Sequence, residues 1–79
     1  MNPHFASLIL GLGTQATAAL EGKLPAEAAG ANPRDVARAL IDTLGVLEEK
    51  TRGHLDADEQ RILTEVLTNL RIRFVQEGR

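Results

Sequence analysis

The sequence predicts an all-α protein, a three-helix unit in which a helical hairpin formed by the second and third helices packs beside an N-terminal helix. Apolar residues recur at spacings of three and four along three segments. Each segment begins at a residue type that caps helices, and a glycine follows the first two. The 79 residues include only two aromatic side chains, both phenylalanine, so Leu, Ile, Val and Ala must build the core. We expect this unit to assemble as a homo-oligomeric bundle.

The first helix is predicted over residues 3–21. Asn2 is placed to cap it, and Pro3 occupies the first helical position, where the missing N–H has no cost. Gly22 is the residue expected just past its end. Residues 22–32 are rich in Ala, Pro and Gly and should form a loop with at most one turn. The apolar face of this helix, whose large residues centre on Phe5, Ile9 and Leu12, consists of Phe5, Leu8, Ile9, Leu12, Ala16, Ala19 and Leu20.

The second helix is predicted over residues 33–52, and it repeats the Asn-Pro start at Asn32. Lys50 and Arg52 lie in its last turn, where cations complement the helix dipole. Gly53 stands just past its end and can take the positive φ of a helix terminus. Its apolar stripe consists of Val36, Ala37, Ala39, Leu40, Ile41, Leu44 and Leu47.

The third helix is predicted over residues 56–76, with fraying between Gln76 and Gly78. Asp56 and Glu59 match the capping-box pattern at its start. The link over residues 53–55 is short, so the second and third helices should be antiparallel neighbours. We therefore interpret residues 1–79 as a single helical domain. The apolar arc of the third helix consists of Ile62, Leu63, Val66, Leu67, Leu70 and Phe74.

The side of the first helix opposite its large residues is uncharged, since no Asp, Glu, Lys or Arg occurs between Met1 and Leu20. An exposed helix face normally carries charged residues. Small residues at helical spacing let two backbones approach closely, so this side is predicted to be an oligomer interface. The alternative is that the helix is buried all round within its own monomer. The predicted interface residues are Ser7, Gly11, Thr14, Gln15 and Ala18.

Four polar residues are candidates for an interhelical network that fixes the register of the helices: Asp42, Lys50, Asn69 and Arg73. Asn69 and Arg73 lie at the edge of the apolar arc of the third helix, whereas Ile72 and Val75 fall outside the arc. We expect Arg73 to lie along this edge with its charge in water. The alternative is that Arg73 reaches Asp42, Glu49 or an acid on a partner chain.

Several classes of function are disfavoured by composition. The net charge of −2 and the two phenylalanines disfavour a nucleic-acid partner, and dipole complementarity and solubility explain a modest basic patch at residues 50, 52, 71, 73 and 79. Polar residues interrupt the first helix, so a membrane span is not expected. No cysteine is present, which fits a cytoplasmic protein. His4 and His54 lack metal-ligand spacing, and Ser7 lacks a base. We expect no catalytic residue, metal or cofactor, and no enzyme activity.

Three stretches make the chain resemble the bacterial family of domain of unknown function 1844: residues 5–16 (FASLILGLGTQA), 41–63 and 67–75 (LTNLRIRFV). The resemblance spans most of the chain apart from the loop at residues 23–31. It implies a small soluble bacterial protein of mainly helical structure, and it implies no known activity. The matching positions are Phe5, Ala6, Ser7, Leu8, Ile9, Gly11, Leu12, Gly13, Gln15, Ala16, Ile41, Asp42, Thr43, Leu44, Glu49, Lys50, Thr51, Gly53, Leu55, Leu70, Arg71 and Arg73.

The function predicted from these observations is a non-enzymatic, homo-oligomeric interaction or scaffold module. Its expected partner is a second copy of the chain, with another protein as the alternative. Two other functions stay open. The uncharged first helix would suit peripheral association with a membrane, and a subunit interface around Asp42, Lys50 and Arg73 would suit a small ligand.

Overall fold

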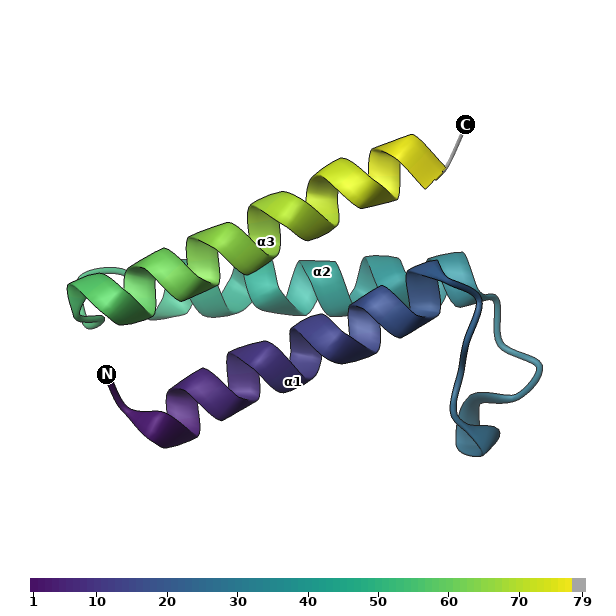
Figure 1. Cartoon of the computed structure of the whole chain (residues 1–79), viewed down its shortest axis with the longest axis horizontal. Helices are drawn as coiled ribbons and strands as arrows, with labels where there is room; N and C mark the ends of the chain where they lie inside the picture. The colour runs from purple at the N-terminus through teal and green to yellow at the C-terminus, as the bar shows by residue number, and fades with distance from the viewer. Residues whose placement is uncertain (78–79) are drawn as a thin grey trace.

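Three α-helices pack side by side in the computed structural model, which describes residues 1–77 (Figure 1). α1 spans Pro3–Leu20, α2 spans Pro33–Lys50 and α3 spans Ala57–Glu77, and a short 3₁₀ helix, η1, spans Ala26–Ala28. α1 and α3 run in the same direction, with α2 antiparallel to both, and each helix contacts the other two. No strand occurs in residues 1–77, so the predicted all-α three-helix fold is confirmed.

The first two helices begin in the same way. Asn2 and Asn32 have extended backbones, and the side-chain oxygen of each accepts hydrogen bonds from the N–H groups two and three residues further on, at 2.9–3.2 Å. Gly22 and Gly53 follow the ends of α1 and α2 with φ of 80° and 86°, a conformation that side chains with a Cβ disfavour. These predicted start and stop signals are confirmed. α3 continues to Glu77, and Gly78 and Arg79 lie outside the described residues.

The core lies where the three helices meet. Its largest fully buried side chains are Ile9 on α1, Leu44 on α2, and Leu63 and Leu67 on α3. Aliphatic side chains thus fill the interior, as the composition predicts. The apolar side chains that pack around this core while partly exposed are Phe5, Leu12, Leu20, Leu40, Leu47, Leu55, Ile62, Val66 and Phe74.

The predicted core face of α1 is wrong at Leu8, which is 47% exposed, and the stripe of α2 is wrong at Ala39, which is exposed. The buried residues of α1 are Ile9 and three small ones, Gly13, Ala16 and Ala19. Small residues there let α1 lie against α2 and α3 at once. At 100° per residue, Leu8 and Leu10 lie on opposite flanks of this buried face, which leaves both half-exposed.

Candidate interaction surface

The start of α3 forms the capping box that the sequence predicts. The Glu59 N–H donates to Asp56 Oδ1 at 2.8 Å, and the Asp56 N–H donates to Glu59 Oε1 at 2.9 Å. Two N–H groups that a helix start leaves without intrahelical partners are thereby satisfied.

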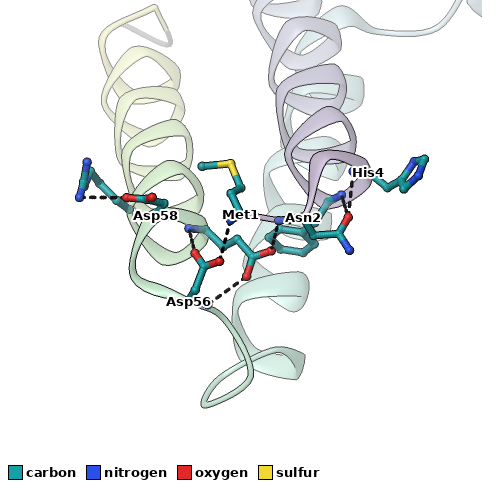
Figure 2. Close-up of polar contacts among 8 residues, drawn as sticks. Met1, Asn2, His4, Asp56 and Asp58 are labelled. Carbon is teal, nitrogen blue, oxygen red and sulfur yellow. Dashed lines mark hydrogen bonds and ion pairs between the residues drawn. The ribbon is translucent and has the colours of Figure 1, made fainter.

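The same box also holds the start of α1, as Figure 2 shows. The Asn2 N–H donates to Glu59 Oε2 at 2.9 Å, and the α-ammonium of Met1 lies 3.1 Å from Asp56 Oδ2. Glu59 is therefore the one charged residue buried among residues 1–77, at 8% exposed, with both carboxylate oxygens bonded. The sequence predicts the box but not its contact with α1, because no local pattern relates two residues that are 57 positions apart.

These contacts shift two pKa values. The hydrogen bond from the Glu59 N–H, assisted by the ammonium of Met1, holds the pKa of Asp56 below its ordinary value. Asp56 in turn raises the pKa of the Met1 ammonium by accepting its hydrogen bond. Each group stabilises the charged form of its partner, so this junction acts as a tie between α1 and α3.

The predicted interface residues of α1 share one uncharged surface strip. Ser7, Gly11, Thr14 and Gln15 are exposed, and Ala18 is half-buried. A Cβ on Gly11 would meet no atom within 4 Å, so the strip is open at its centre. The Thr14 hydroxyl donates to the carbonyl of Leu10 at 2.8 Å, which satisfies the hydroxyl within the helix.

An open groove of about 570 Å³ lies between α1 and α3. Leu10 and Ile72, from opposite helices, are 52% and 51% exposed, far more than core side chains. The groove contains a single charged side chain, that of Arg73, and no carboxylate or imidazole. Its lining residues are Leu10, Gly13, Thr14, Thr17, Val66, Asn69, Leu70, Ile72 and Arg73.

Arg73 does not reach either of the acids on α2 that the sequence suggested. Its guanidinium lies 3.7 Å from the Glu21 carboxylate at the end of α1 and 3.4 Å from that of Glu77. The reason is that Arg73 lines the groove between α1 and α3, so its nearest acids belong to those helices.

The four residues of the predicted polar network are not brought together within one chain. Asp42 and Lys50 are exposed on α2, and Asn69 is exposed on α3. Within residues 1–77, no hydrogen bond or ion pair joins any two of the four. A network that includes residues of a second chain stays a prediction.

The histidines and the serine of the described residues do not gather into a site. His4 and His54 are both exposed, and residues 1–77 contain no group of three His, Cys, Asp or Glu placed to hold a metal ion. Ser7 lies on the exposed strip of α1. Across the same residues, no helix combines the length and apolarity that crossing a bilayer requires.

Residues 2–76 match the model of one protein family, described as "Domain of unknown function (DUF1844)". The match covers α1, α2, both loops between the helices, and α3 up to Gln76. No curated protein and no solved structure matches the chain.

Proposed function

The chain belongs to the family described as "Domain of unknown function (DUF1844)", and on that premise we propose that it is a non-enzymatic, homo-oligomeric helical interaction module. The observation that carries the proposal is the continuous surface formed by the uncharged strip of α1 and the groove beside it. Leu10 and Ile72 stand half-exposed there, and Ser7, Gly11, Thr14 and Gln15 extend it without a charge. The centres of protein interfaces are depleted in charged residues in this way.

The size of the chain supports the same proposal. A domain of this length buries only about 60% of the surface of its unfolded chain, so additional burial between copies would add stability to a small core. The polar groups of the groove are two threonines, an asparagine and an arginine. None of them is a general base or an activated nucleophile. We therefore propose a binding function for this surface and no catalytic one.

Sedimentation equilibrium tests the proposal on the wild-type chain. We expect a dimer or higher oligomer at micromolar concentrations. A folded monomer over that whole range would overturn the proposal.

Substitutions at Gly11 test the surface itself. Leucine at position 11 fits the monomer, since a Cβ there meets no atom within 4 Å, but it would fill the centre of the strip. We therefore expect Gly11→Leu to weaken association while circular dichroism shows an unchanged helix content. Gly11→Ala adds only a methyl group and is the matched control. Unchanged assembly of Gly11→Leu would place the interface elsewhere.

Peripheral membrane association is the second candidate, because Leu8 and Leu10 expose apolar surface on a helix without charge. Interfacial helices usually combine such residues with Lys and Arg, which α1 lacks. Co-sedimentation with neutral and anionic vesicles decides this candidate. Binding that Leu10→Glu abolishes would support it, and recovery of all the protein in the supernatant would exclude it.

A further inference from the structure

Five residues of α3 lie four positions apart on one ridge of the helix, which turns about 40° around the axis at each step: Arg61, Glu65, Asn69, Arg73 and Glu77. We call them the charged row. Its formal charges read plus, minus, neutral, plus, minus, so the row is complementary to a reversed copy of itself. When two such rows run antiparallel with Asn69 facing Asn69, Glu65 faces Arg73. Arg61 then faces Glu77.

We propose that a second copy of this chain packs on this face with its α3 antiparallel to the first, about a two-fold axis at Asn69. The proposal rests on the proposed function and specifies its partner and register. In a two-fold dimer each contact occurs twice, so two Glu65–Arg73 pairs and two Arg61–Glu77 pairs form together. Rows of residues four apart are the ridges that interlock in the commonest helix–helix packing of globular proteins.

The surroundings of the row supply the apolar contact that exposed ion pairs by themselves do not. Val66 and Ile72 flank Asn69 on α3, and all three line the groove together with Leu10 of α1. Exposed ion pairs add little affinity, and their main effect is on register and choice of partner. In the proposed dimer the groove therefore provides the buried area, and the charged row selects the antiparallel register.

Contacts within one chain leave part of the row without a partner. Arg73 is 3.4 Å from Glu77, but Arg61 pairs with Asp58 at 3.2 Å instead of with Glu65. Glu65 is exposed and has no ion pair within residues 1–77. The row contains two oppositely charged pairs at a spacing of four residues, Arg61–Glu65 and Arg73–Glu77. In both pairs the basic residue comes first, which is the weaker order for stabilising an isolated helix. Intrahelical pairing thus accounts for the row only in part.

Charge reversal at Glu65 and Arg73 tests the register. The two residues are eight positions apart on one helix, about 12 Å along its axis, so they do not pair within a chain. We expect Glu65→Arg and Arg73→Glu each to weaken dimerisation about tenfold, because symmetry doubles every lost pair. The double variant should recover the wild-type dissociation constant to within a few-fold.

Mixing the two single variants gives the sharpest result. In their heterodimer, arginine at position 65 of one chain faces glutamate at position 73 of the other, and the second pair is native. We expect the mixture to associate more tightly than either variant alone. Melting curves of each variant control for folding. The outer pair, Arg61→Glu with Glu77→Arg, repeats the test should Arg73→Glu fail to fold.

A cross-link checks the axis directly, because the chain contains no native cysteine. Asn69→Cys should form an intermolecular disulfide rapidly under mild oxidation, whereas Thr43→Cys, at an exposed position of α2, should not. A wild-type dimer that neither reversal weakens, or that cross-links equally at both positions, overturns the register and leaves the proposed function standing. A wild-type monomer overturns both.

Discussion

Gly13 on α1 and Val66 on α3 lie so close together that a Cβ on Gly13 would be 2.9 Å from Val66 Cγ1. Gly13 is buried, whereas Gly11, two residues earlier, faces open space. The two glycines of one short motif therefore have different roles. Gly13 sets the spacing of α1 and α3 within the chain, and Gly11 keeps the exposed strip small.

Alanine at these two glycines should change stability in opposite directions. Gly11→Ala should raise the free energy of unfolding by up to ~1 kcal/mol, because alanine favours the helix and meets no neighbour. Gly13→Ala should lower it by about 1 kcal/mol, because the clash costs more than the gain in propensity and a helical valine is stiff. Urea denaturation at one protein concentration measures both.

Trimming the facing residue provides the control for this pair. In a Val66→Ala background the clash is gone, so Gly13→Ala should no longer destabilise. If Gly13→Ala and Gly11→Ala were equally stabilising in the wild-type background, the close approach of the two helices would be refuted.

Among the acidic residues, Glu59 should be the one whose substitution lowers the free energy of unfolding most. Its carboxylate accepts from the backbone of both Asp56 and Asn2, so Glu59→Ala leaves two N–H groups without partners. We expect a loss of about 1–3 kcal/mol in the free energy of unfolding, and a smaller loss for Glu59→Gln, which keeps one acceptor oxygen. Glu48→Ala is the matched control, an acid without such bonds. Equal effects of Glu59→Ala and Glu48→Ala would argue against the tie between α1 and α3.

Arg34 should contribute more to stability than its neighbour Arg38. Arg34 Nη1 donates to the Phe74 carbonyl at 3.0 Å, one of the last four carbonyls of α3, and its guanidinium carbon is 3.7 Å from the centroid of the Phe74 ring. Lysine would keep the charge but lose the planar stacking, so Arg34→Lys should cost about 1 kcal/mol.

Arg38 provides the internal comparison, since its guanidinium carbon lies 5.5 Å from the same ring centroid. Arg38→Lys should have little effect on the melting temperature. A similar melting temperature for the two variants would show that the closer contact of Arg34 adds no stability.

Acid should weaken the junction at Asp56. The pKa of Asp56 is lowered in the folded chain, so its contribution to stability is complete above the unfolded value of 3.8 and is lost as the pH falls below that value. Asp56→Asn keeps a cap acceptor but does not titrate. The stability advantage of wild type over Asp56→Asn, measured by denaturation, should therefore shrink at low pH. An advantage that is independent of pH would contradict the assigned cause.

Local chemistry made the helix starts and stops predictable. Asn2, Asn32 and the Asp56–Glu59 box act on N–H groups within three residues, and Gly22 and Gly53 have positive φ. Such signals depend on a few neighbouring residues and on backbone sterics, so the sequence contains them in full. The apolar periodicity likewise predicted most core residues, because a helix repeats its faces at a fixed angle.

The exposed surface was less predictable, because it depends on how distant segments of the chain pack against one another. The uncharged strip of α1 was visible in the sequence, but the groove beside it forms only where α1 and α3 come together in the folded chain. Periodicity shows that a residue is at the edge of a face without showing which helix lies there. Arg73 accordingly pairs with Glu21 at the end of α1 and not with an acid of α2.

By itself, the sequence determined three helices, their caps and an aliphatic core, since these follow from interactions within a few residues and from one helical period. Only the tertiary structure decided that Glu59 bridges to Asn2, that Gly13 makes room for Val66, and that Leu10 and Ile72 face the same groove. Each of these relationships involves residues more than 45 positions apart in the sequence. Their geometry depends on how three helices rotate and cross when they bury their apolar faces together.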